Sequence, residues 1–147
     1  MKRKMMRAIV LFLCTLLALL IFIGLYVDQT QRVQETYRTQ FTAHLDQTAD
    51  AIDSYLNADG DLPLRYRRIL SNFSGADSFA FLMDGLTDDQ KTAVNGLLAC
   101  LMKYPEQMQE KERMEALKEA VDDMRGNLDK GFDEAAELVE GIDKKGY

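Results

Sequence analysis

Histidine and cysteine, which build most metal and nucleophile sites, are nearly missing from this chain of 147 residues. Its one histidine is His44, and its two cysteines are Cys14 and Cys100. Such a set cannot make a zinc site without several carboxylates. A Ser-His-Asp triad would have to use His44, which we expect instead to be a partly buried helix residue with a satisfied ring nitrogen. Cys100 lies among apolar residues, which predicts a buried, inert thiol, with an intermolecular disulfide as the alternative.

Sequence motifs of catalytic and cofactor sites are missing as well. The chain has no nucleophile elbow, no phosphate-cradling glycine loop and no paired-carboxylate hydrolase pattern. Segment 57–61 is acidic enough to suggest calcium binding. Aligning Gly60 with the glycine of an EF-hand, however, puts Tyr55 and Tyr66 at ligand positions that should be acidic. We therefore expect no cofactor, no metal site and no enzymatic activity.

Charge is missing from one long stretch, residues 8–27. As a helix this stretch covers roughly 30 Å, the thickness of the hydrocarbon core of a bilayer. Four basic residues precede it, and basic flanks stay on the cytoplasmic side. The sequence thus predicts a cytoplasmic basic tail at 1–7, a single-pass signal anchor in the lipid bilayer at 8–27, and an extracytoplasmic domain at 28–147.

A cleaved signal peptide and a buried core helix are the alternatives for residues 8–27. Signal peptides have an apolar region of about 7–15 residues followed by a small-residue cleavage site. Here the run is longer, and its end at 22–28 has no Ala-x-Ala pattern. A core helix of a soluble protein would keep a polar stripe, which this stretch does not have. Both observations favour an uncleaved anchor.

Positive charge is scarce beyond the N-terminal tail. The chain has a net charge of −6, and its first seven residues contribute +4, which leaves −10 for the remainder. Such an acidic domain argues against nucleic acid as a partner and against flat docking on anionic lipid. We expect a protein partner or a homo-oligomer instead.

Hydrophobic periodicity predicts an all-α fold. Apolar residues recur at steps of three and four through 33–56, which indicates a helix continuous with the anchor and ending near Asn57. Gly60 is expected to be a left-handed terminator, and Pro63 suits the first turn of a helix that follows. We expect that helix to span about 64–72 and to end at 74–77, with a short helix or turn over 79–86.

Two further helices are expected in the second half of the chain. Thr87 and Gln90 match a capping box, and the helix that they open should stop before Pro105. From 106 to 142 apolar residues keep a period of about 3.5, which predicts one long final helix with a bend near Gly126. The two long helices would lie antiparallel, returning the C-terminus to the membrane surface, with the shorter helices capping the far end.

One basic cluster breaks the acidity of the outer domain: Arg65, Arg67 and Arg68. One interpretation is that acidic side chains at 59–61 or in the final helix compensate it. The other is a ligand that bears a carboxylate or phosphate, because guanidinium groups bind such anions through two hydrogen bonds. We expect such a site to lie between helices, near the segment 79–81.

Three hypotheses about function follow from these patterns. The first is a non-enzymatic membrane-anchored scaffold, or an accessory subunit of an envelope complex, that mediates protein–protein interaction. The second is an extracytoplasmic sensor-like module that binds a small anionic ligand near Arg65, Arg67 and Arg68. The third is an enzyme that uses His44 beside an acid and a hydroxyl.

Overall fold

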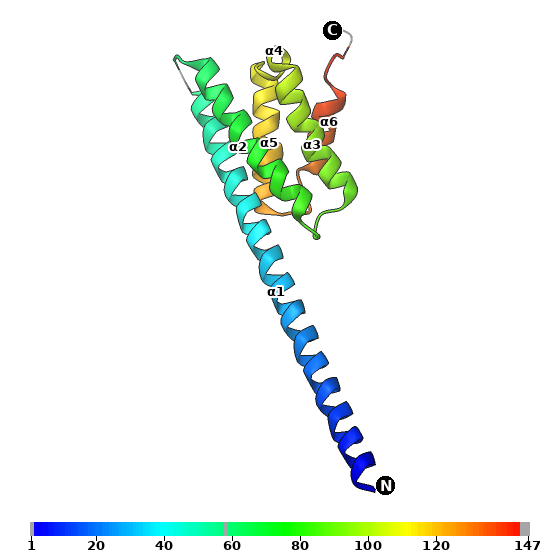
Figure 1. Cartoon of the computed structure of the whole chain (residues 1–147). Helices are drawn as coiled ribbons and strands as arrows, with labels where there is room; N and C mark the ends of the chain where they lie inside the picture. The colour runs from blue at the N-terminus through cyan, green and yellow to red at the C-terminus, as the bar shows by residue number, and fades with distance from the viewer. Residues whose placement is uncertain (1, 58, 145–147) are drawn as a thin grey trace. The chain divides into compact units, whose positions relative to one another are not determined.

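The computed structural model describes residues 2–57 and 59–144 and contains no strand within these ranges. The all-α prediction is confirmed (Figure 1). The helices are α1 (Lys2–Leu56), α2 (Leu62–Leu82), α3 (Asp88–Lys103), α4 (Pro105–Met108), α5 (Lys111–Gly126) and α6 (Phe132–Glu140). The chain divides into two compact units, an N-terminal unit (Met1–Thr36) and a C-terminal unit (Tyr37–Tyr147), with the boundary inside α1. The predicted continuity of the first helix through the membrane stretch to residue 56 is confirmed.

The N-terminal unit contains the apolar part of α1. Its large apolar side chains from Ile9 to Val27 are all exposed, from 44 % at Leu16 to 73 % at Tyr26. Of the described helices, α1 is the one that is long and apolar enough to cross a membrane, and none of its apolar window is buried. Among the described residues this surface is fully exposed, and the hydrocarbon core of a bilayer is an environment that suits it.

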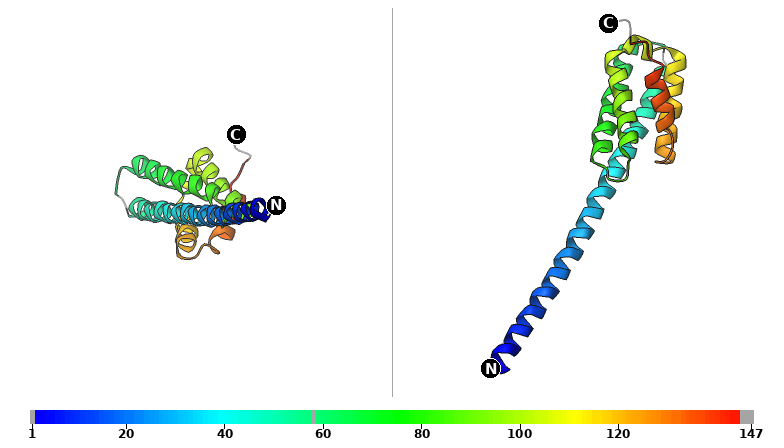
Figure 2. Two further views of the ribbon diagram at one scale, coloured as in Figure 1. Left: turned by 60° about the horizontal axis from the view of Figure 1, so that its bottom comes forward. Right: turned by 90° about the vertical axis from the view of Figure 1, so that its right-hand side faces the viewer.

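The C-terminal unit is built around one stripe of α1. Phe41, Leu45 and Ile52 are completely buried, and Thr48 lies between them with its hydroxyl donating to the His44 carbonyl oxygen at 2.7 Å. Helix α2 runs antiparallel to α1, because Asn72 donates to the Gln47 carbonyl while Arg65 reaches Ser54 further along α1. The remaining helices complete the unit (Figure 2).

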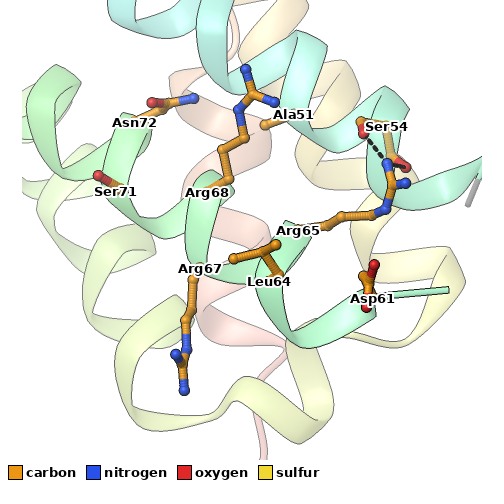
Figure 3. A pocket seen from close by; sticks show the side chains of 9 residues that line it. All are labelled: Ala51, Ser54, Asp61, Leu64, Arg65, Arg67, Arg68, Ser71 and Asn72. Carbon is orange, nitrogen blue, oxygen red and sulfur yellow. Dashed lines mark hydrogen bonds between the residues drawn. The ribbon is translucent and has the colours of Figure 1, made fainter.

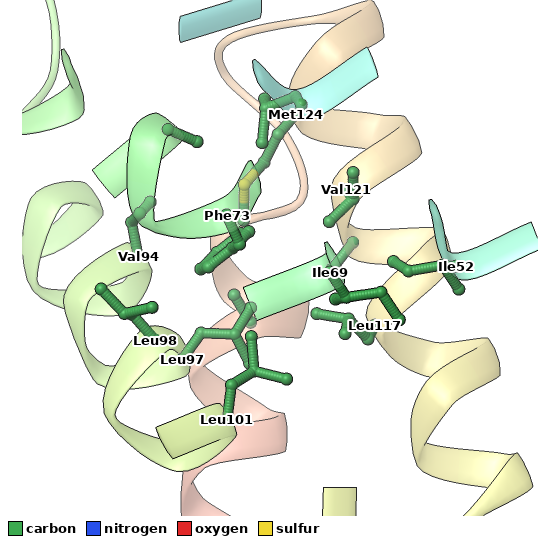
Figure 4. Close-up of a cluster of buried hydrophobic side chains, with 14 of the residues drawn as sticks. Ile52, Ile69, Phe73, Val94, Leu97, Leu98, Leu101, Leu117, Val121 and Met124 are labelled. Atoms are coloured by element: carbon green, nitrogen blue, oxygen red, sulfur yellow. The ribbon is translucent and has the colours of Figure 1, made fainter. Parts of the chain in front are cut away.

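A single apolar core joins the helices of this unit. Its largest fully buried side chains come from five helices: Phe41, Phe73, Leu45, Ile52, Ile69, Leu97, Leu101, Met108, Met114, Leu117, Met124 and Val94. Figure 4 shows part of this core, where Ile69 and Phe73 of α2 lie among side chains of α3 and α5. Burying a side chain of this size stabilises a fold by about 1.5–3 kcal/mol relative to exposure. Cys100 is also buried, at 3 % exposed, as predicted, and burial raises the pKa of its thiol.

Helix α2 corrects the expectation of two short pieces, because it continues without interruption through residues 74–77. Gly75 does not end the helix but lets the His44 ring approach it. A Cβ atom at Gly75 would lie 2.5 Å from His44 Cε1 and Nδ1. Close packing, rather than helix termination, therefore explains this glycine.

The turn that precedes α2 also differs from the expectation. Asp61, rather than Gly60, has the left-handed conformation, with φ 55° and ψ 31°. Aspartate tolerates this region better than most residues with a side chain. Pro63 lies in the first turn of α2, as predicted.

Helix α3 follows its local signals closely. The backbone N–H of Gln90 donates to Thr87 Oγ1 at 3.2 Å, and the backbone N–H of Thr87 donates to Gln90 Oε1 at 2.9 Å. The capping box is therefore confirmed. The helix ends at Lys103, before Pro105. Because proline has no N–H, the Leu101 carbonyl has no helical donor. The buried Tyr66 hydroxyl donates to it at 2.7 Å instead.

The expected long final helix is wrong: the segment forms α4, α5 and α6, and the chain reverses between α5 and α6. Gly131 makes this reversal possible, because its φ is 83°. A Cβ atom at this position would lie only 2.3 Å from the Ala120 carbonyl oxygen. The apolar period continues across the turn because α6 buries Phe132 and Ala135 against its neighbours. Periodicity alone does not register such a reversal.

The direction of α6 places the C-terminal end differently from the expectation. The Asp143 amide nitrogen donates to Gln107 Oε1 at 3.0 Å, and Arg113 donates to the Gly141 carbonyl. Tyr55, near the end of α1, reaches the Gln109 carbonyl in the same region. Within the C-terminal unit, residues 141–143 therefore lie at the end where α1 finishes, not at the end where α1 enters, whereas one long final helix antiparallel to α1 would have ended at the other side. Figure 2 shows α6 running toward this end of the unit.

Candidate functional site

A groove of about 540 Å³ lies between α1 and α2 in the C-terminal unit, and the three predicted arginines line it (Figure 3). We call it the arginine groove. Its lining residues are Ala51, Ser54, Asp61, Leu64, Arg65, Arg67, Arg68, Ser71 and Asn72. Most of them recur on α2 at steps of three and four, which places them along one side of that helix.

Arg65 is held by the protein itself. Its Nη1 atom donates to the Ser54 carbonyl oxygen at 3.0 Å and also to the Ser54 hydroxyl, and its Nε atom donates to the Gly60 carbonyl oxygen at 3.1 Å. Ser54 lies in the last turn of α1, where carbonyl groups lack helical donors and a positive charge is favourable. Arg65 thus caps α1 and ties it to the start of α2.

Arg67 and Arg68 are exposed, and in the described part of the chain neither has a hydrogen bond or an ion pair. The acids at 59–61 and in the segment expected to be the final helix form no ion pair with these two arginines among the described residues, so direct pairing does not compensate the cluster. Asp61 lines the groove but forms no ion pair with the arginines there. Figure 3 shows Arg68 extending toward α1 while Arg67 extends to the opposite side, so their guanidinium groups diverge.

Two basic residues of α5, Lys118 and Arg125, pair with acidic residues of α1 outside the groove. Lys118 Nζ lies 2.8 Å from Asp53 Oδ1, and Arg125 Nη1 lies 3.4 Å from Asp46 Oδ1. The hydrogen bond to Asp53 raises the pKa of Lys118. Asp122 contacts both basic side chains, at 3.5 Å and 3.0 Å, and completes the network.

The structure does not bring the segment 79–81 to the arginines. Phe79 stacks on the His44 ring with 5.6 Å between centroids, and Tyr37 packs beside it at 6.3 Å. Phe81 is 76 % exposed and lines a separate hollow between α2 and α3. Both phenylalanines lie near the other end of α2, several turns away from Arg68.

His44 is partly buried, as predicted, but its ring nitrogen is not satisfied. Nδ1 has no hydrogen-bond partner in the part of the chain that the structure describes. The ring lies between Phe79 and the backbone of Gly75, where it fills space. Within residues 2–57 and 59–144, no group of three or more His, Cys, Asp or Glu side chains could hold a metal ion.

Sequence reasoning missed the residues that surround the arginines. Leu64 is 68 % exposed and lines the groove, while Tyr66 is buried. The signal was available: a row of Tyr66, Ile69 and Phe73 at helical steps places Leu64 outside the buried face. Ser54 is 11 residues before Arg65 and carries no local sign of this contact.

Comparison of the chain with protein-family models, curated proteins and solved structures finds no match. Its function has to be argued from its own residues.

Proposed function

We propose that this protein is a non-enzymatic, single-pass membrane protein whose C-terminal unit binds another protein, as a scaffold or as an accessory subunit of an envelope complex. Residues 8–27 would span the bilayer. The basic residues before this stretch support a cytoplasmic N-terminus and an extracytoplasmic C-terminal unit, because basic flanks are retained inside.

The observation that carries the proposal is the exposed apolar surface of α1. Its large side chains from residue 9 to residue 27 are exposed among the described residues, with Leu17 at 62 % and Phe22 at 71 %. Each such side chain gains about 1.5–3 kcal/mol on leaving water. Lipid provides that environment on every side of the helix, whereas a partner helix would cover only one face.

An interaction role for the C-terminal unit is supported by its surface and its core. The core is filled by side chains from its own helices, with Leu97 and Met114 completely buried. In the groove, in contrast, the surface retains two arginines without partners in the described residues and an exposed leucine on the same helix. Arginine is enriched at protein interfaces.

Crosslinking in native membranes tests this proposal. Full-length protein treated with an amine-reactive crosslinker in its own membranes should give a discrete adduct of defined mass. Leu97→Asp, which places a charge in the core, should remove the adduct without releasing the protein from the membrane. A protein that yields neither a partner nor a homo-oligomer, or an adduct that survives Leu97→Asp, would contradict an interaction role for the folded unit.

The second candidate function is an anion-binding module, favoured by the guanidinium groups of Arg67 and Arg68, which have no partner within residues 2–57 and 59–144. Their divergence in Figure 3 argues against one small anion that both would hold. Phosphate and citrate are suitable probes, because a ligand of the folded state raises the melting temperature. If neither anion changes the melting temperature of the detergent-solubilised protein at constant ionic strength, this candidate is rejected.

A further inference from the structure

We propose that the arginine groove is the docking surface for an acidic segment of the partner protein, whose carboxylates pair with Arg67 and Arg68 while an apolar side chain covers Leu64. This inference rests on the proposed interaction function and specifies its site and the chemistry of its partner.

The groove combines charge with an exposed apolar side chain. Leu64, at 68 % exposed, precedes Arg67 and Arg68 by three and four residues, so the three side chains are neighbours on the surface of α2. Protein interfaces commonly have an apolar centre bordered by polar and charged residues, with arginine among the main contributors to affinity. Ser71 and Asn72 add polar groups to the same groove.

The orientation of the arginines favours a polypeptide over a small anion. Arg68 extends toward α1 near Ala51, and Arg67 extends to the other side (Figure 3). One phosphate or carboxylate cannot bridge guanidinium groups that point apart. Two acidic side chains, separated along a peptide, can each form a bidentate pair with one arginine.

The negative charge of the C-terminal unit supports the proposal that an acidic segment of the partner binds at the groove and not elsewhere on this unit. From residue 37 onward the chain has 22 acidic and 13 basic residues, a balance of −9, and three of the basic residues lie at positions 65, 67 and 68. An acidic segment is repelled by most of this surface and attracted at the groove. Complementarity of this kind determines where and in which orientation partners meet.

The groove is also held in shape before any partner binds. Arg65 connects the last turn of α1 to α2 through Ser54 and Gly60, and Asn72 Nδ2 donates to the Gln47 carbonyl at 3.0 Å. These bonds fix the two helices that form the walls. A surface that needs no rearrangement loses less entropy on binding.

Site-specific photocrosslinking tests this docking surface. The photoreactive residue p-benzoylphenylalanine is placed at Leu64 in the full-length protein in its own cells, and at Met102, which is 63 % exposed on α3, as the control. We expect an adduct from position 64 and none from position 102. Mass spectrometry of the adduct should map the crosslink to a segment of another protein that contains at least two acidic residues.

Charge reversal then examines the arginines. Arg67→Glu together with Arg68→Glu should lower the yield of the adduct by about tenfold or more, because each charge-assisted pair becomes a repulsion. Arg38→Glu, at an exposed arginine outside the groove, should leave the yield unchanged. Circular dichroism melting of the double variant serves as a folding control, since neither arginine has an intramolecular partner among the described residues.

Several outcomes overturn the inference: no adduct at position 64, an adduct that charge reversal does not weaken, or an adduct with lipid or a second copy of the chain. The proposed function is judged separately, by chemical crosslinking of the whole surface. A partner captured there but not at Leu64 leaves the interaction function in place and rejects this groove as its site. Loss of the chemical adduct as well rejects both.

Discussion

The two parts of α1 contrast sharply, although they belong to one helix. From residue 9 to residue 27 the large apolar side chains surround the helix and all are exposed. From residue 37 to residue 56 they follow one stripe, and Phe41, Leu45 and Ile52 in that stripe are completely buried. Both parts are helical, so helix propensity does not separate them. The arrangement of apolar residues around the axis differs: one part is apolar on every side and apolar enough to cross a membrane, and the other buries one stripe in a protein core.

The largest expected effect comes from charge in the first part. Leu16→Asp with Leu20→Asp places two carboxylates on the apolar part of α1, at about 3 kcal/mol each for insertion into a bilayer. We expect the protein to move from the carbonate-resistant membrane pellet to the supernatant. The control, Arg38→Asp with Gln40→Asp, changes exposed residues of the second part and should remain in the pellet. Retention of the first variant would refute lipid as the environment of residues 8–27.

A smaller apolar side chain should lower the stability of the C-terminal unit only when it replaces a residue of the second part of α1. Leu45 is completely buried, and Leu45→Ala is expected to lower the free energy of unfolding of the C-terminal unit by about 2–5 kcal/mol. Leu17 is 62 % exposed, so Leu17→Ala should leave that free energy unchanged. Urea titration in detergent micelles, followed by tyrosine near-ultraviolet circular dichroism, measures both. Equal losses of unfolding free energy from the two substitutions would contradict the contrast between the exposed and the buried part of α1.

The glycines provide a smaller and more specific comparison. Gly75→Ala forces a Cβ atom to within 2.5 Å of the His44 ring and should destabilise the C-terminal unit by about 1–3 kcal/mol. Gly24→Ala has open space, with nothing within 4 Å, and should have no such effect. Adding His44→Ala to Gly75→Ala should recover part of the loss in urea titrations. Without any recovery, the His44 ring is not what Gly75 accommodates.

The smallest effect on stability is expected at Asp77, which accepts a hydrogen bond from Asn95. Burial raises the pKa of Asp77, while the hydrogen bond from Asn95 opposes this shift. The contribution of Asp77 to stability is therefore fully present below its ordinary pKa and is lost as the pH rises through the raised value. Asp77→Asn should slightly increase the melting temperature at pH 7, and this gain should vanish at acidic pH.

Asp28 is the matched control for Asp77. Its side chain is 58 % exposed and forms a surface pair with Arg32 at 3.0 Å, an interaction that contributes little. Asp28→Asn should leave the melting temperature of the C-terminal unit unchanged at every pH. A melting temperature that falls with Asp77→Asn at pH 7 would mean that the ionised carboxylate stabilises the fold.

Local patterns predicted the elements that local interactions control. The capping box at Thr87, the stop before Pro105 and the end of α1 at Leu56 all depend on residues within one or two turns. The same reasoning failed at Gly75 and Gly131. Gly75 accommodates the His44 ring, and Gly131 accommodates the Ala120 carbonyl oxygen. Both groups lie outside the local sequence around the glycine.

The candidate site shows the same division. The cluster of Arg65, Arg67 and Arg68 is evident from the chain alone, and so is its contrast with the acidity around it. That Arg65 is occupied by Ser54, while Arg67 and Arg68 diverge and have no partner in the described residues, depends on how α2 packs against α1.

Order along the chain was enough to establish an all-α protein with one helix apolar enough for a membrane, since periodicity and charge are properties of neighbouring residues. The reversal before α6 and the groove lined by Leu64, Arg67 and Arg68 depend on how the helices pack, and could not be read from the sequence. The reason is that the sequence shows which face of each helix must be buried, but many pairings of helices would bury these faces equally well. Contacts between distant side chains select one of these pairings.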